Sequence, residues 1–135
     1  MMAAGIGFGK SVDEIIRIVR KAALFNPTKD YNWLPFMSLI GGRRMEQLLK
    51  TTATDMAGNT DIHIEDSWRT LFMVSSNYSK AREEVHTRGS YVRYLLATSA
   101  IPGVFPPVID GPDLLVDGGT FNNFPADMMS RMDVG

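Results

Sequence analysis

The chain has 135 residues, of which 44% are hydrophobic, and this length and composition fit one globular domain with its own core. Fourteen Lys and Arg against fifteen Asp and Glu leave a formal net charge of -1, which excludes a global positive field for nucleic acid or an anionic bilayer. The absence of cysteine excludes disulfides, thiolate metal sites and cysteine nucleophiles, and a cytoplasmic location is therefore expected.

The longest apolar runs, residues 1–9 and 91–109, do not fit a membrane-spanning helix. The first is too short, and an arginine and three prolines interrupt the second, so neither reaches about 18 uninterrupted apolar residues. Lys10 follows the first run, whereas a signal peptide carries its positive charge before the apolar core. We therefore expect no transmembrane segment and no signal peptide, and any membrane contact would be peripheral. The aromatic candidates for such contact are Trp33, Phe36 and Trp68.

A helix is predicted first in the chain, over about residues 11–24. Ser11 followed by Glu14 forms a capping box, and Asn26-Pro27 ends the apolar periodicity. The expected buried face consists of Ile15, Ile16, Val19, Ala22 and Ala23.

Shorter elements are predicted in the middle of the chain. A helix is expected over residues 43–50, and the polar residues 51–60 are expected to form a loop. Residues 71–74 read as a buried strand that ends before a polar Ser-Ser-Asn sequence, and residues 84–87 read as an edge strand. A helix follows Gly89-Ser90 and ends before a Pro-Gly pair.

The last predicted strand, residues 114–116, places Asp117 at its carboxyl end. The alternation of helices and strands predicts an open α/β sheet covered on both faces, in which ligands gather at the carboxyl ends of strands. Gly118 and Gly119 supply backbone torsions closed to other residues, which would aim the carboxylate at a neighbouring loop. An Asp before Gly can also simply cap its own turn, so the residues alone leave both roles open. A closing helix has Pro125 in its first turn and Asn123 available as its cap.

Three segments near the end of the chain resemble the patatin-like phospholipase family, in particular its branch of bacterial patatin-like esterases and neuropathy target esterase. They are Pro-Gly-Val-Phe-Pro-Pro at 102–107, Leu-Leu-Val-Asp-Gly-Gly at 114–119 and Asn-Asn-Phe-Pro at 122–125. Further matches lie at residues 42–44, 64–68 and 85–90, so the resemblance covers nearly the whole chain.

The resemblance implies a three-layer patatin-like α/β fold, related to the α/β hydrolases, and a serine lipid acyl hydrolase with a Ser-Asp dyad. Asp117 would be the base of the dyad, and the substrate would be a glycerolipid or lysophospholipid ester. No cofactor, metal ion or nucleic acid is implied. The residues that would support the turn behind the base are Gly118, Gly119, Asn122, Asn123 and Pro125.

Two parts of the family pattern do not occur in these 135 residues: the Gly-x-Ser-x-Gly nucleophile elbow and the Gly-rich oxyanion loop. In the family both precede the helix that residues 1–9 resemble, so residues 1–135 are expected to be the carboxyl-terminal part of the catalytic domain, incomplete at the N-terminus and inactive alone. The internal serines lack the flanking glycines of an elbow; they are Ser75, Ser76, Ser79 and Ser99.

Several alternatives remain open on the residues alone. One alternative is a non-catalytic remnant that binds lipid or a partner. Ala4 followed by Gly9-Lys10-Ser11 nearly fits a P-loop, which would indicate nucleotide binding. The two histidines are expected to have surface or packing roles. Three acids are candidates to gather around a cation, although no metal site is predicted; they are Asp110, Asp113 and Asp117.

Overall fold

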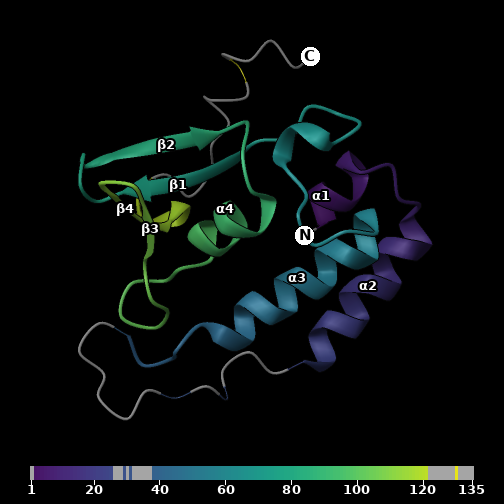
Figure 1. Ribbon diagram of the computed structural model, residues 1–135, viewed down its shortest axis with the longest axis horizontal. Coiled ribbons are helices and arrows are strands. Elements are labelled where there is room, and N and C mark those ends of the chain that lie inside the picture. Colours follow the sequence, from purple (N-terminus) through teal and green to yellow (C-terminus); the bar gives the residue numbers. More distant parts are fainter. Residues whose placement is uncertain (1, 26–28, 30, 32–37, 122–129, 131–135) are drawn as a thin grey trace.

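The computed structural model describes residues 2–25, 29, 31, 38–121 and 130 (Figure 1). Its helices are α1 (Met2–Gly7), α2 (Val12–Leu24), α3 (Arg43–Ala57) and α4 (Tyr91–Thr98). Its strands are β1 (Met73–Asn77), β2 (Arg82–His86), β3 (Val108–Asp110) and β4 (Asp113–Asp117). Two short 3-10 helices are η2 (Ile64–Asp66) and η3 (Gly118–Thr120). The described part of the chain is a mixed α/β structure, which agrees with the predicted class.

The strands form one sheet in the order β2-β1-β4-β3, and every neighbouring pair is antiparallel. Residues 78–81 join β1 to β2, and Gly111-Pro112 joins β3 to β4. Connections this short return a strand beside its predecessor in the opposite direction, whereas a parallel neighbour needs a crossover of a dozen or more residues. The described strands therefore differ from an open α/β sheet of the expected kind in direction, because such sheets are mostly parallel. Strand β3 was not predicted, because its three residues are too few to show the alternation of apolar and polar residues that indicates a strand.

The helices lie in a series on one side of the sheet (Figure 1). Helix α4 contacts β1 and β4, α3 contacts α4, and α2 contacts α3. The largest cluster of buried apolar side chains lies between these elements; it contains Ala4, Ile18, Leu49, Ala53, Met56, Ile62, Ile64, Met73, Tyr91 and Val92. Phe8, after α1, meets Tyr91 edge to face with ring centroids 5.7 Å apart. Helix α4 is therefore the central element, buried between the sheet and the other helices.

Helix α2 confirms the helix predicted over residues 11–24. The Ser11 hydroxyl accepts from the Glu14 N–H, and the Glu14 carboxylate accepts the Ser11 N–H at 2.9 Å, which completes the capping box. Its buried face differs from the expected one, because Ile18 is buried and Ile16 is exposed. Helix α2 packs against both α1 and α3. The position of these two helices determines that the face with Ile15 and Ile18 is the buried one.

Helix α3 has 15 residues and is longer than predicted, because residues 51–57 continue it instead of forming a loop. Three hydroxyls donate to the carbonyl four residues earlier; they belong to Thr51, Thr52 and Thr54. Ala53 and Met56 on the same segment are buried in the core. Tertiary packing therefore overrides the polar composition, and the helix ends where Gly58 takes a φ of 77°.

Strand β1 begins later and ends later than the strand predicted over residues 71–74. It runs over Met73–Asn77, so the polar Ser75, Ser76 and Asn77 lie within the strand and are fully buried. Each of these side chains has a hydrogen-bond partner, which removes most of the cost of burying it. A prediction based on apolar runs cannot detect polar residues that are buried together with their hydrogen-bond partners.

Candidate functional site

Asp117 is the last residue of β4, the position the sequence predicts for it. Its backbone N–H donates to the carbonyl of Ala100, just after α4, at a distance of 3.0 Å. The β1–β4 ladder pairs Asp117 with Ser75 on the central strand. The backbone of Asp117 is therefore held from two sides, by the sheet and by the end of α4.

The Asp117 side chain uses one of its two oxygens to cap the turn behind it. Oδ1 accepts the N–H of Gly119 at 3.0 Å. Among the described residues Oδ2 accepts no hydrogen bond. The side chain is half-buried, so this second oxygen remains able to take a proton from a neighbouring hydroxyl.

The two glycines after Asp117 have a different role from the one expected. Both lie in η3, and neither has a positive φ, so the prediction of special torsions is wrong. Gly118 is required by close approach instead, because a Cβ at this position would lie 2.3 Å from the carbonyl oxygen of Val74 in β1. The η3 turn therefore packs directly against the backbone of β1. The other expected supporting residues, Asn122, Asn123 and Pro125, lie outside the described residues.

The side chain of Ser76 in β1 forms two hydrogen bonds with the same turn. Its hydroxyl accepts the N–H of Phe121 at 3.2 Å and donates to the carbonyl of Gly118 at 3.4 Å. These contacts connect β1 to both ends of η3. A fully buried serine therefore helps fix the direction in which Asp117 leaves the strand.

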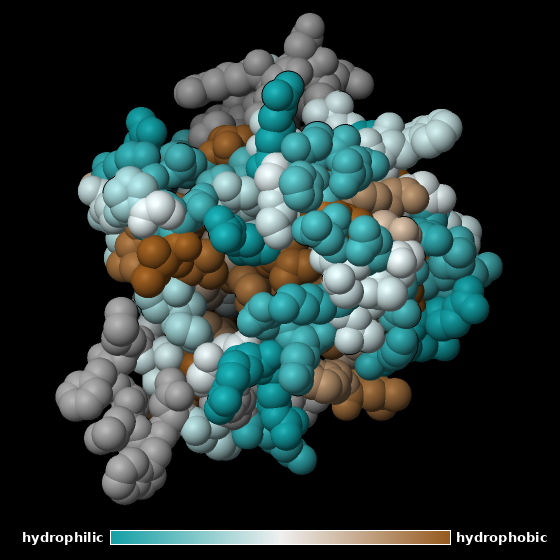
Figure 2. Space-filling view, viewed as in Figure 1, coloured by the Kyte–Doolittle hydropathy of each residue, from teal (hydrophilic) through white to brown (hydrophobic). Residues whose placement is uncertain are grey.

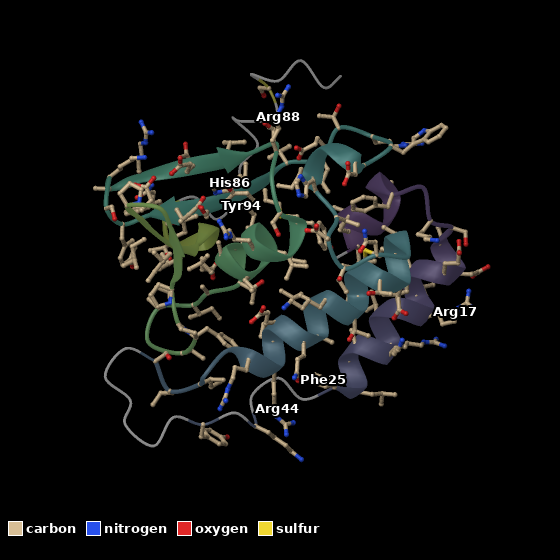
Figure 3. All side chains as sticks on the ribbon, in the orientation of Figure 1. Arg17, Phe25, Arg44, His86, Arg88 and Tyr94 are labelled. Atoms are coloured by element: carbon tan, nitrogen blue, oxygen red, sulfur yellow. The ribbon has the colours of Figure 1, made fainter. Side chains whose placement is uncertain are left out.

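A buried polar group that sequence reasoning missed lies beside Asp117, on the face of the sheet that α4 covers. The Ser75 hydroxyl and Nε2 of His86 share a hydrogen bond of 2.7 Å. The His86 ring stacks on Tyr94 of α4, with centroids 4.0 Å apart (Figure 3). The Tyr94 hydroxyl donates to Asp110 of β3 at 2.9 Å. Side chains of directly paired residues project from one face, so Asp117 shares this face with Ser75.

His86 makes stability depend on pH. Burial lowers its pKa below 6.5, and Glu84 and Asp110 partly oppose that shift. Above pH 6.5 the imidazole is neutral in both states; on acidification the unfolded chain takes up the proton first, so stability is lost as the pH falls from 6.5 through the folded-state pKa.

We expect the free energy of unfolding, measured by urea titration, to fall more between pH 7.5 and 5.5 in the wild type than in His86→Gln. The variant lacks the titrating group but retains every carboxylate, so it corrects for other acid effects. Equal losses in both proteins would contradict the assignment to His86.

The four serines considered as internal nucleophiles all have structural roles. Ser75 and Ser76 are fully buried and hydrogen bonded within the sheet. The Ser79 hydroxyl accepts the N–H of Leu114 at 3.0 Å and so connects two hairpins. The Ser99 hydroxyl donates to the carbonyl of Leu95 at 2.9 Å, at the end of α4. Ser79 is exposed, but it lies on the hairpin turn between β1 and β2, and none of the four serines stands on the strand-to-helix turn of a nucleophile elbow.

The three aspartates considered for a cation are engaged separately. Asp110 accepts from Arg93 and Tyr94, each at 2.9 Å, and Asp113 pairs with Lys80 at 2.6 Å. Across the described residues no group of three acidic or histidine side chains has the geometry of a metal site. Each acid of β3 and β4 apart from Asp117 thus has a basic partner.

The P-loop alternative does not fit the structure. A P-loop is an extended turn between a strand and a helix, whereas Ala4 lies inside helix α1. The Ser11 hydroxyl serves as the cap of α2, and Lys10 lies 3.8 Å from Glu14. The residues that resembled a phosphate-binding loop therefore have local roles at the ends of two helices.

The described helices are short, and the longest of them, α3, has 15 residues. In the part of the chain that the structure describes, no helix combines the length and hydropathy needed to cross a bilayer. Trp68 is 87% exposed, whereas the other two aromatic candidates, Trp33 and Phe36, lie outside the described residues. His63 is also a surface residue, 3.6 Å from Glu65, and has the surface role expected for it.

Comparison with known proteins finds relatives along nearly all of the chain. Residues 1–130 match the family model described as patatin-like phospholipase. An uncharacterised NTE family protein of Mycobacterium tuberculosis is 35% identical over 128 residues, which are 94% of this chain and 21% of the relative. The neuropathy target esterase of Drosophila melanogaster is 33% identical over 100 residues, 73% of this chain and 7% of the relative. A lysophospholipase of Mycosarcoma maydis is 39% identical over 72 residues, 53% of this chain and 4% of the relative.

The chain thus spans about a fifth, or less, of the length of these relatives. The match to the family model nevertheless includes every described helix and strand and the β4–η3 turn that carries Asp117. The chain belongs to the patatin-like phospholipase family.

Proposed function

We propose that this chain supplies the base of a Ser-Asp dyad in a lipid acyl hydrolase, and that the base is Asp117. The observation that supports this best is the arrangement of its carboxylate: the backbone is held by β1 and by Ala100, Oδ1 caps the turn, and Oδ2 has no partner among the described residues. A general base needs this combination of fixed position and an available lone pair.

The proposed mechanism is nucleophilic catalysis. A serine hydroxyl transfers its proton to Asp117 as its oxygen attacks the carbonyl carbon of the ester, and backbone amides stabilise the oxyanion. Collapse of the tetrahedral intermediate expels the alcohol, which takes the proton from Asp117, and leaves an acyl-serine. Water then gives its proton to Asp117, attacks the acyl-serine and releases the fatty acid. Asp117 passes this proton to the departing serine oxygen, which restores both the serine hydroxyl and the carboxylate base.

The proposed substrate is a glycerolipid ester, in particular a lysophospholipid. Relatives in Mycosarcoma maydis and Eremothecium gossypii carry the name lysophospholipase, and the Drosophila relative is named an esterase. The exposed indole of Trp68 supports peripheral contact with the lipid surface on which such a substrate is found.

Residues 1–135 would then form part of a three-layer patatin-like domain whose serine and oxyanion amides precede Met1. Alone, they would be inactive, because this sequence contains no Gly-x-Ser-x-Gly and its internal serines have structural roles. Loss of the nucleophile in a comparable triad enzyme costs on the order of a millionfold in rate.

A non-catalytic remnant that binds lipid or a partner is the second candidate. The observation that favours it is the hydrogen bond from Gly119 to Asp117, which an aspartate with a purely structural role would also make.

The two candidates are separated by expressing the reading frame extended before Met1 and assaying hydrolysis of a p-nitrophenyl ester. The proposal expects an in-frame Gly-x-Ser-x-Gly, hydrolysis by the extended protein and none by residues 1–135 alone. An upstream sequence without that motif, or an extended and folded protein without esterase activity, would support the remnant instead.

A further inference from the structure

A small, mainly apolar pocket lies between α3, α4 and the segment that leads into β3. Its volume is about 140 Å³. Its lining is mainly apolar and comes from Met45 of α3, Leu96 of α4, Ala100, Phe105, Pro106, Pro107 and Val108; the polar residues that also line it are Arg43, Glu46 and Ser99. We call this the α3–α4 pocket. The side of the molecule where β3 lies also carries exposed apolar surface (Figure 2).

The pocket is adjacent to Asp117 through two connections. Ala100 lines the pocket, and its carbonyl accepts the Asp117 N–H at 3.0 Å. Val108 lines the pocket and pairs with Leu115, two residues before Asp117 on the same face of β4. Two residues of a strand span about 7 Å. The pocket and the carboxylate therefore lie on the same side of the sheet, within the length of a short hydrocarbon segment.

Gly42 keeps the walls of the pocket close together. A Cβ at this residue would lie 2.8 Å from Cγ of Pro106, and its φ of 80° is one that other residues rarely adopt. The start of α3 can therefore approach the proline-rich segment only with glycine at this position. The pocket is thus shaped by backbone as well as by side chains.

The size and lining of the pocket indicate its ligand. Cavities of about 150 Å³ lined by apolar side chains hold a ligand the size of benzene, whereas whole drug-sized ligands need roughly 300 Å³ or more. The α3–α4 pocket therefore has room for a short stretch of hydrocarbon but none for a phospholipid head group.

Larger cavities in the described residues suit an acyl chain less well. One of about 280 Å³ is lined by Glu14, Arg17, Lys21 and Asp55, and its charged groups would have to lose water to receive hydrocarbon. Another of about 430 Å³ is lined mainly by polar and charged side chains, Lys50, Asp61 and Arg93 among them.

We propose that the α3–α4 pocket receives a segment of the substrate's acyl chain next to the ester, while the head group remains outside. This rests on the proposed hydrolase function, because that function brings an acyl ester to Asp117. The pocket then selects for chain length and shape near the carbonyl.

The test uses two neighbouring residues of β3 that face opposite ways. Val108→Phe fills the pocket, whereas Ile109→Phe adds the same ring to a side chain that is already 71% exposed. The probe is cis-parinaric acid, a fluorescent fatty acid, titrated below its aggregation concentration into the 135-residue chain, with decanoate as competitor. We expect saturable, displaceable binding by the wild type and by Ile109→Phe, and at least about tenfold weaker binding by Val108→Phe, the equivalent of excluding two methylenes.

Absence of saturable binding by the wild type, or equal binding by the two variants, would overturn the proposal. Should Val108→Phe fail to fold, methyl NMR of the wild type decides the question. Decanoate should shift the Met45 and Ala100 methyl resonances, which line this pocket and neither of the two larger cavities, and leave that of Ile16 on α2 unchanged; the opposite pattern would refute the pocket as the site.

Failure of this proposal and failure of the proposed function give different results. Asp117→Asn should bind cis-parinaric acid as the wild type does, because the acyl pocket does not use the carboxylate. In an extended protein with esterase activity, Val108→Phe should lower kcat/KM for p-nitrophenyl decanoate relative to the acetate ester by about tenfold. Binding without catalysis would leave the pocket in place and remove the hydrolase; an unchanged decanoate-to-acetate ratio would remove the pocket alone.

Discussion

Asp117→Asn should abolish ester hydrolysis in a protein that joins these residues to a Gly-x-Ser-x-Gly segment, with a fall in kcat on the order of 10⁴-fold. The amide cannot accept the serine proton, which removes general-base catalysis. Its carbonyl oxygen can still accept the Gly119 N–H that Oδ1 of Asp117 accepts at 3.0 Å. The turn should therefore remain intact, and the loss should appear in kcat with little change in melting temperature.

Asp113→Asn is the matched control for this experiment. It removes a carboxylate from the other end of the same strand, one that pairs with the Lys80 ammonium at 2.6 Å. The hydrogen bond from this ammonium is the main reason the pKa of Asp113 lies below its usual value. The Asp113 carboxylate is therefore paired at the end of β4 opposite to η3. We expect activity within about twofold of the wild type, since an exposed ion pair contributes little. If Asp117→Asn retained activity close to that of Asp113→Asn, Asp117 would not be the base.

Gly118→Ala should destabilise the fold by about 1–3 kcal/mol, near the upper end of that range. The new Cβ would lie 2.3 Å from the Val74 carbonyl oxygen, which belongs to the central strand and cannot rotate away as a flexible side chain would. Relief of this clash requires η3 to move off β1, with loss of the contacts that Ser76 makes to the turn. The free energy of unfolding from urea titration measures the effect.

Gly7→Ala is the control for the loss of a glycine as such. Gly7 is the last residue of helix α1, and its Cβ would meet Ser67 and Leu71 at ordinary van der Waals distances of 3.7 and 3.8 Å. We expect the same or slightly higher stability, because alanine favours a helix over glycine by up to about 1 kcal/mol. Similar losses in both variants would argue against the close approach of η3 to β1 as the cause.

Local patterns in the sequence were enough to predict several features. The capping box at Ser11 and Glu14 placed helix α2, because its hydrogen bonds join residues three apart and need no distant partner. The apolar triplet before Asp117 placed β4 and the position of the acid at its carboxyl end. The motif around that acid also indicated the family that the comparisons then showed.

Pairing and packing between distant segments required the tertiary structure. The antiparallel order β2-β1-β4-β3 depends on which strands meet, and the continuation of α3 through Met56 depends on the core that buries this side chain. Neither is encoded in the apolar pattern of one segment.

The candidate site divides in the same way. Asp117 itself was recognisable from its neighbours in the chain, whereas the Ser75–His86 hydrogen bond joins residues on adjacent strands that sequence alone treats as a strand end and an edge. The need for glycine at 118 was predicted but for the wrong reason, since the demand comes from Val74, 44 positions away, rather than from torsion. The acid at position 117 could be recognised from the residues next to it in the chain. The contacts that position its side chain form only when β4 pairs with β1.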